Sequence, residues 1–186
     1  MEKIRGKHVV LRPVLEEDYP IFASFMNDVD CSFYIMTTEK LYGVEDERRY
    51  FTEDPHGKRQ LAIVYEDHLV GLVELFDINW VHQSATMGIH LGPAAARGKG
   101  LGEDALRLIL DYGFYVLNLH SIRLTAMSTN RRALALYKKV GFKEIGRLRQ
   151  TRHVAGQWED TVIMDILAEE HTPYVYYDKL MEIFES

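Results

Sequence analysis

A short glycine-rich stretch contains the residues whose types and spacing point most directly to chemistry. It reads Arg97-Gly98-Lys99-Gly100-Leu101-Gly102. Glycines let a ligand approach the backbone closely, and free amides at a helix N-terminus attract anions. The spacing fits neither a P-loop nor a dinucleotide fingerprint, whose third glycine would stand at Glu103. The stretch therefore predicts an anion-binding loop, with a glycine-rich turn that binds nothing as the alternative.

The residues on either side predict that this loop joins a strand to a long helix. The segment from Ser84 to Leu91 is predicted as a strand. From Leu101 to Tyr115, apolar residues recur every three or four positions, which gives one continuous apolar face. The loop is therefore expected at a strand-to-helix junction, where the first amides of the helix are free to bind a ligand.

The rest of the chain alternates between predicted strands and helices. The other predicted strands are 8–13, 60–65, 69–77, 121–128, 144–153 and 158–167. The other predicted helices are 16–27, 44–51 and the segment between the N-cap residue Asn130 and Gly141. Residues 28–55 give the weakest pattern. The order predicts an α/β layer fold with a mixed sheet.

Composition limits the possible functions. A chain of 186 residues with 47% hydrophobic and 27% charged residues fits one globular domain. Its net charge of −6 argues against a nucleic-acid partner. The single cysteine, Cys31, excludes an intramolecular disulfide, and His82 and His90 have no nearby third ligand, so no metal site is expected. The sequence shows neither a signal peptide nor a membrane span, so we expect a cytoplasmic protein without membrane association.

The glycine loop and a second motif resemble the Gcn5-related N-acetyltransferase (GNAT) family. Residues 97–102 fit that family's Arg/Gln-x-x-Gly-x-Gly/Ala pyrophosphate loop in full. The family's Asn…Ala…Tyr…Gly-Phe signature recurs at Asn130, Ala133, Tyr137, Gly141 and Phe142. Residues 110–120 resemble the branch that contains ribosomal-protein and spermidine acetyltransferases. The resemblance covers about residues 9–167 and implies a mixed, mostly antiparallel central sheet of six to seven strands flanked by helices.

The resemblance implies acetyl-CoA as cosubstrate and assigns its contacts. The strand before the loop would offer backbone groups to the pantetheine arm and to the oxyanion, and Asn130 would contact the cofactor as well as cap its helix. The residues assigned are Ile89, His90, Leu91, Arg97, Gly98, Lys99, Gly100, Leu101, Gly102, Asn130 and Lys139. Basic residues on the loop and the later helix supply the local positive charge that a polyphosphate needs. For Lys138 and Lys139, a solvated surface position is an equally good interpretation.

Tyr137 is the candidate general acid. A phenol with a pKa of about 10 stays protonated at pH 7 and can donate to a departing thiolate, whose parent thiol has a pKa of about 8.5. The alternative is that Tyr137 only packs on its helix face. The general base is not evident, because Thr86 stands where many relatives have a glutamate. Glu74 and Asp77, on one strand, are candidates acting through water, with an exposed strand position as the alternative for each. His82 and His90 are the other titratable candidates.

These observations predict an acetyl-CoA-dependent N-acetyltransferase, an acyltransferase that acts by direct transfer to a primary amine. Residues 70–82 resemble strands of spermidine acetyltransferases, and Glu74 and Asp77 suit a polycation, which favours a polyamine or similar small amine. The segment 33–39 has one acid only, where those enzymes have a Glu-Glu-Pro-type acidic segment, so their polyamine-binding and regulatory contacts are not carried over. An N-terminal α-amine is the alternative acceptor, since its pKa near 8 leaves roughly a tenth of it neutral at pH 7. A non-catalytic acyl-CoA-binding module is the alternative from another class.

We expect residues 1–168 to form the GNAT domain. Residues 169–186 would form a C-terminal tail that can include a short helix. We also expect a homo-oligomer.

Overall fold

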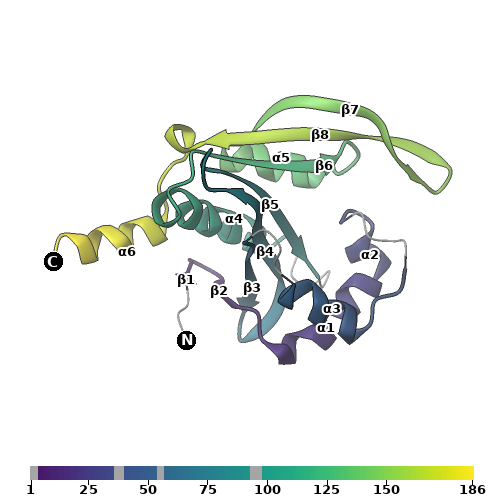
Figure 1. The fold of residues 1–186 in the computed structure, drawn as a ribbon, viewed down its shortest axis with the longest axis horizontal. Coiled ribbons are helices and arrows are strands. Elements are labelled where there is room, and N and C mark those ends of the chain that lie inside the picture. The colour runs from purple at the N-terminus through teal and green to yellow at the C-terminus, as the bar shows by residue number, and fades with distance from the viewer. Residues whose placement is uncertain (1–3, 36–39, 54–56, 93–97) are drawn as a thin grey trace.

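The computed structural model describes residues 4–35, 40–53, 57–92 and 98–186, and Figure 1 shows how their helices and strands are arranged. Its described part contains an eight-stranded sheet in the order β1-β2-β3-β4-β5-β6-β8-β7. The strands are β1 Ile4–Arg5, β2 Val10–Pro13, β3 Arg59–Tyr65, β4 His68–Asn79, β5 Ser84–Leu91, β6 Ser121–Met127, β7 Lys143–Val154 and β8 Gln157–Leu167. All neighbours are antiparallel except β5 and β6. The predicted mixed, mostly antiparallel sheet is confirmed. It has one strand more than the six to seven predicted, and that strand is β1, whose two residues are too few to show an apolar–polar alternation.

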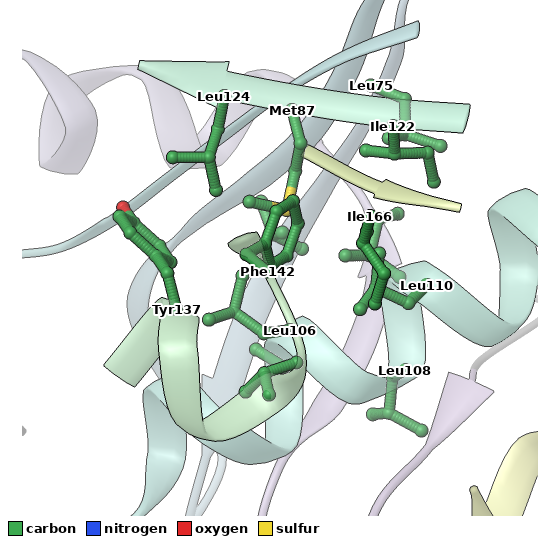
Figure 2. Packing of buried hydrophobic residues seen from close by; sticks show 14 of the residues in the cluster. Leu75, Met87, Leu106, Leu108, Leu110, Ile122, Leu124, Tyr137, Phe142 and Ile166 are labelled. Carbon is green, nitrogen blue, oxygen red and sulfur yellow. The ribbon is translucent and has the colours of Figure 1, made fainter. Parts of the chain in front are cut away.

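Helices cover both faces of the sheet. They are α1 Tyr19–Asn27, α2 Val29–Ser32, α3 Val44–Thr52, α4 Leu101–Asp111, α5 Arg131–Val140 and α6 Val175–Phe184. Side chains alternate between the faces of a strand, so Val73 and Leu75 of β4 lie in the larger core with α4 and α5. Leu72 faces the other way and packs with Phe22 and Phe25 of α1. Figure 2 shows the larger core, in which Leu106 of α4 lies among residues of the sheet and α5.

The sheet opens between its two parallel strands. β5 and β6 pair only at Ser84 with Ser121, Ala85 with Ile122 and Thr86 with Arg123. β5 continues to Leu91 and β6 to Met127, and Figure 1 shows the two strands diverging. Along the described part of β5 from Met87 onward, the backbone groups on the β6 side have no ladder partner. Unpaired backbone donors and acceptors of this kind are available to a ligand.

The helix after the glycine loop is shorter than its apolar pattern predicts. α4 ends at Asp111, and Tyr112–Val116 continues as a wider π-helical turn. Gly113 lies in that turn, where an added Cβ would come within 2.8 Å of Ile122 Cδ1. The wider turn therefore brings the backbone directly against β6, which periodicity alone does not reveal.

The C-terminal residues are joined to α4 through a buried carboxylate. Asp111 accepts hydrogen bonds from His171 Nε2 at 2.8 Å, from Tyr174 N at 3.1 Å and from Tyr177 N at 2.9 Å. Tyr174 itself provides no side-chain cap to α6. Asp111 thus caps α6, which lies near the C-terminal end of the chain, from another helix. None of the helices described is long and apolar enough to cross a membrane.

Candidate functional site

The glycine loop is placed at the start of α4, as predicted. Gly98 and Gly100 both have φ of +78°, and a Cβ added at either would meet no described residue within 4 Å. Gly100 is the N-cap residue and provides no side-chain cap, so the first amides of the helix, from Leu101 to Glu103, have no intrahelical partner. Open space above free amides suits a phosphate group. Arg97 lies outside the described residues and stays a prediction.

The acidic residues in the first turn of α4 are neutralised by other groups. Glu103 bonds Lys139 Nζ at 2.5 Å and Arg107 Nε at 3.2 Å, and the bond from Lys139 lowers the pKa of Glu103. Asp104 accepts from the backbone N–H groups of Lys7, His8 and Val9 at 3.1, 2.6 and 2.8 Å. The carboxylates are thus engaged away from the free amides, which stay available to an anion.

Asn130 and Lys139, which the resemblance assigns to the cofactor, lie at opposite ends of α5. Asn130 is the N-cap, and its Oδ1 accepts from Ala133 N at 3.2 Å. Lys139 is placed by its ion pair with Glu103, whereas Lys138 lies 3.9 Å from Glu144. The predicted capping role of Asn130 is confirmed, and its contact with a cofactor stays a prediction.

Tyr137 combines a buried ring with a hydroxyl at the edge of the core. Its ring lies 6.0 Å from that of Phe142, and the residue is 8% exposed. In Figure 2 the hydroxyl oxygen points away from the buried cluster. Burial raises the pKa of Tyr137 to about 12, so the phenol keeps its proton at neutral pH. Packing and proton donation are therefore compatible in this residue.

Ile89, His90 and Leu91 lie beyond the last pair between β5 and β6, and their contact with the pantetheine arm stays a prediction. The His90 side chain faces α1, with ring centroids 6.2 Å from Phe22 and 6.4 Å from Phe25. Burial lowers the pKa of His90 to about 4, which makes the imidazole a weak base. His82 is exposed in the turn before β5, so the two histidines lie at opposite ends of that strand.

Glu74 is held firmly on the sheet face that α1 and α3 cover. Both carboxylate oxygens accept from Tyr50 Oη at 2.7 Å, and Oε2 also accepts from Gln60 Nε2 at 3.0 Å. Glu74 pairs with Gly88 of β5, where an added Cβ would lie 3.1 Å from Oε1. The carboxylate thus lies over β5, one of the two strands that border the opening. Sequence reasoning missed Tyr50 and Gln60 because no local pattern links them to Glu74.

Asp77 and Thr86, the other positions considered for the general base, have different surroundings from Glu74. Asp77 is exposed, with φ of +50°, where the register of β4 and β5 shifts. Thr86, at the position of the missing glutamate, accepts from Arg123 Nε at 3.2 Å. Among the described residues, no group of His, Cys, Asp or Glu is placed to hold a metal ion.

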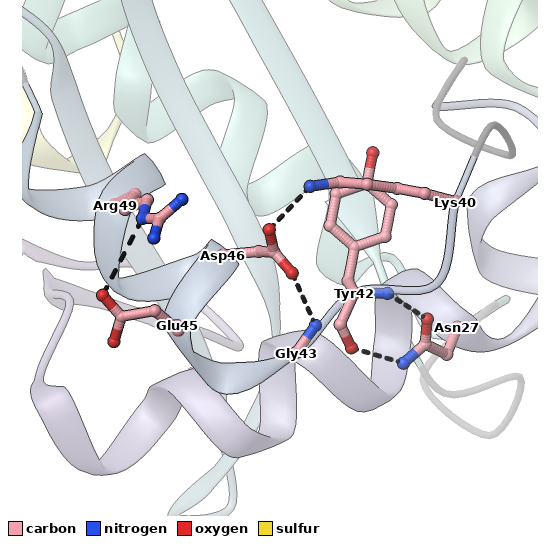
Figure 3. A network of polar contacts seen from close by, with 7 residues as sticks. All are labelled: Asn27, Lys40, Tyr42, Gly43, Glu45, Asp46 and Arg49. Carbon is pink, nitrogen blue, oxygen red and sulfur yellow. Dashed lines mark hydrogen bonds and ion pairs between the residues drawn. The ribbon is translucent and has the colours of Figure 1, made fainter.

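Polar contacts organise the chain leading into α3 (Figure 3). Asn27 and Tyr42 exchange two hydrogen bonds, with Nδ2 donating at 2.8 Å and Oδ1 accepting at 2.7 Å. Asp46 accepts from Gly43 N at 2.8 Å and pairs with Lys40 at 2.6 Å. These contacts fix α3 against the C-terminal end of α1. Residues 36–39, which complete the segment compared above, lie outside the described residues.

The known proteins to which this chain is similar are acetyltransferases. A family model described as an acetyltransferase (GNAT) domain matches residues 8–143. A spermidine N(1)-acetyltransferase of Escherichia coli K12 is 33% identical over 179 residues, covering 89% of this chain and 91% of that protein. A putative ribosomal N-acetyltransferase of Bacillus subtilis is 27% identical over 111 residues, covering 60% of each chain. The crystal structure of spermidine N-acetyltransferase from Vibrio cholerae in complex with CoA and spermine superposes with a TM-score of 0.80 at 28% identity, covering 89% of this chain and 98% of that one.

Proposed function

Because this chain belongs to the GNAT family of acetyltransferases, we propose that it acetylates a primary amine of a polyamine such as spermidine. The family assigns the activity and the cosubstrate, acetyl-CoA. The observation that carries the acceptor is the Glu74 carboxylate, which is fixed by Tyr50 on the sheet face beside the β5–β6 opening. An anchored anion there favours a cationic substrate. The relatives named for spermidine acetylation support the same acceptor.

The residues on the α4 and α5 side would bind the cosubstrate. Free amides of the loop and of the first turn of α4, from Gly98 to Gly102, would bind its pyrophosphate, as the open space at Gly98 and Gly100 allows. Lys99, Asn130, Lys139 and Arg97 are the proposed side-chain contacts. The unpaired backbone of residues 89–91 would hold the pantetheine arm. Acetyl-CoA supplies the thioester whose acetyl group is transferred.

In the proposed reaction the amine reaches the thioester carbonyl from the α1 and α3 side, through the opening between β5 and β6. Glu74 orients the amine and takes its proton through water. A backbone N–H of residues 89–91 donates to the oxyanion, an interaction worth about 3 kcal/mol in other enzymes. As the C–N bond forms and the C–S bond breaks, Tyr137 gives its proton to the leaving sulfur. Tyr137 and Glu74 are thus the proposed catalytic residues.

An N-terminal α-amine is the second candidate acceptor. It is favoured by the weak basicity of His90 and by the bond between Thr86 and Arg123, which leave no strong base at those two positions. An α-amine with a pKa near 8 needs less help to lose its proton than an alkyl amine with a pKa near 10.4. The similarity to a putative ribosomal N-acetyltransferase also supports this acceptor.

Release of free thiol from acetyl-CoA discriminates among these functions. We expect kcat/KM for spermidine to exceed that for short peptides beginning with Ser or Ala by about tenfold, and Glu74→Gln to reduce spermidine turnover. Peptides preferred by that margin would establish the α-amine instead. Binding of acetyl-CoA without turnover of any amine would establish a non-catalytic module.

We also propose the organisation of the whole protein. Residues 1–168 would form the catalytic domain, and residues 169–186 a tail attached to α4 through Asp111. A homo-oligomer is supported by exposed apolar side chains at the end of α6, where Ile183 is 64% and Phe184 is 84% exposed. The single cysteine fits a cytoplasmic protein. Light scattering after size-exclusion chromatography would test the oligomer, and a mass equal to one chain would refute it.

A further inference from the structure

Glu47 of α3 is a buried acid without a described partner. Only 5% of the residue is exposed, and its carboxylate forms no hydrogen bond or ion pair with another described residue. Burying an unpaired carboxylate costs free energy, and Glu is rarely so buried unless it is paired. The known contacts of the fold therefore give no reason for a carboxylate at this position.

Tyr50 links Glu47 of α3 to Glu74 of β4. Tyr50 and Phe51 follow Glu47 by three and four residues, so the three share one face of α3. Phe51 packs 5.5 Å from Tyr19 of α1, and Tyr50 donates to Glu74 of β4. Burial raises the pKa of Tyr50, the charge of Glu74 and its hydrogen bond raise it further, and the charge of Glu47 adds a smaller effect.

The two cations described near Glu47 and Tyr50 are engaged with other groups. Lys58 Nζ lies 4.3 Å from the centroid of the Tyr50 ring, on the same side chain that bonds Glu74. Lys40, the cation that acts on Glu47, is already paired with Asp46, whose own charge opposes ionisation of Glu47. An additional positive charge near Glu47 would offset the cost of its burial.

We propose that Glu47 is a second carboxylate of the acceptor site, which binds a protonated amine of the polyamine other than the one acetylated. This inference rests on the proposed function. A polyamine carries several ammonium groups separated by methylene chains, so two separated carboxylates can recognise it where one would serve a simple amine. Burial raises the pKa of Glu47 to about 7, and a bound ammonium would favour its ionised form.

The test compares Glu47→Gln with Glu45→Gln on the same helix, where Glu45 is exposed and pairs only with surface arginines among the described residues. We expect Glu47→Gln to raise KM for spermidine about tenfold or more, with kcat within about twofold and KM for acetyl-CoA unchanged. KM for butylamine, which has one ammonium group, should be equal in the wild type and in both variants. Glu45→Gln should match the wild type with every substrate.

The outcomes separate this inference from the proposed function. A wild-type enzyme that does not acetylate spermidine would refute the proposed function. Normal spermidine turnover with the same KM in Glu47→Gln and Glu45→Gln would overturn the role of Glu47 alone. An equal rise in KM for butylamine would also overturn it, because Glu47 would then act on the reacting amine. If circular dichroism shows Glu47→Gln unfolded, Glu47→Met, which also removes the charge, replaces it, and an unchanged spermidine KM in that variant overturns the role.

Discussion

Tyr137 offers a test in which one atom separates two roles. Tyr137→Phe keeps the ring against Phe142 and removes only the hydroxyl, whose oxygen points out of the core. We expect kcat to fall by about 10²-fold with acetyl-CoA affinity nearly intact, as for a proton donor used in the transition state. Because the pKa of Tyr137 is about 12, its ionisation should not reduce wild-type kcat below about pH 10. Steady-state kinetics and calorimetry measure both, and a fully active Phe variant would leave Tyr137 a packing residue.

Gly100 offers a second test at the scale of one residue. It shares φ of +78° and an open Cβ position with Gly156, which lies in the turn between β7 and β8. Valine at either position should cost a similar amount of stability, about 2 kcal/mol, because both sites require left-handed backbone. Only Gly100→Val should also weaken acetyl-CoA binding, by about tenfold or more, because its side chain fills the space above the free amides.

Calorimetry on both valine variants separates backbone strain from a direct effect on the cosubstrate. Equal acetyl-CoA affinity in Gly100→Val and Gly156→Val would exclude the loop at the start of α4 as the pyrophosphate site. A β-branched residue at Gly100 affects the fold as well as the site, because Gly100 has a positive φ.

At the scale of elements, the attachment of α6 depends on α4. The Asp111 carboxylate is fully buried and satisfies the N-terminus of α6 together with the His171 ring. Asp111→Asn keeps the shape but replaces one acceptor oxygen with a donor, which faces the Tyr177 N–H or the His171 ring. We expect a loss of about 2–4 kcal/mol in the free energy of unfolding.

Hydrogen exchange measures where that loss occurs. Amides from His171 to Phe184 should exchange faster in Asp111→Asn, whereas those of the sheet should change only in line with global stability. Asp178→Asn is the matched control, because Asp178 is an exposed acid in the first turn of the same helix. Similar protection of α6 in both variants would show that Asp111 does not hold it.

Elements could be predicted from the sequence where burial is periodic. The apolar face that begins at Leu101 follows from one packed surface, and the apolar run of β4 follows from packing on both faces of the sheet, so local composition and spacing were sufficient. The position of Asn130 also indicated the start of α5. The contacts of Glu74 could not be predicted, because Tyr50 and Gln60 reach it from separate elements. The opening between β5 and β6 depends on where strand pairing stops, which is a tertiary property.

At the scale of the whole molecule, Glu47 should affect stability in a pH-dependent way. Its pKa is raised from 4.5 to about 7, so the folded state favours the neutral form and binds the proton more tightly than the unfolded chain. The loss of folding stability caused by ionising Glu47 is therefore absent below about pH 4.5. It grows between pH 4.5 and about 7 and is complete above pH 7. Glu47→Gln should increase the free energy of unfolding by about 2–3 kcal/mol more at pH 8 than at pH 4.5.

Urea unfolding at the two pH values measures this difference. Glu45→Gln should show almost none of it, because the Glu45 carboxylate is exposed and paired with surface arginines. A Glu47→Gln effect that is the same at both pH values would mean that the carboxyl is not a destabilising buried acid. If spermidine is the ligand of Glu47, the increase in the free energy of unfolding that Glu47→Gln gives at pH 8 should be smaller when spermidine is present.

The two buried carboxylates of α4 also set an order in which the protein can be completed during synthesis. The backbone donors of Asp104 come from Lys7, His8 and Val9, which are made long before the helix. The described donors of Asp111 come instead from residues 171–177, the first of them 60 residues later. At about 5–20 residues per second, Asp111 waits roughly 3–12 s for its partners on the ribosome. During that interval the backbone donors of Asp104 are already present, whereas the donors of Asp111 and the Tyr174 hydroxyl that also bonds Asp104 are not.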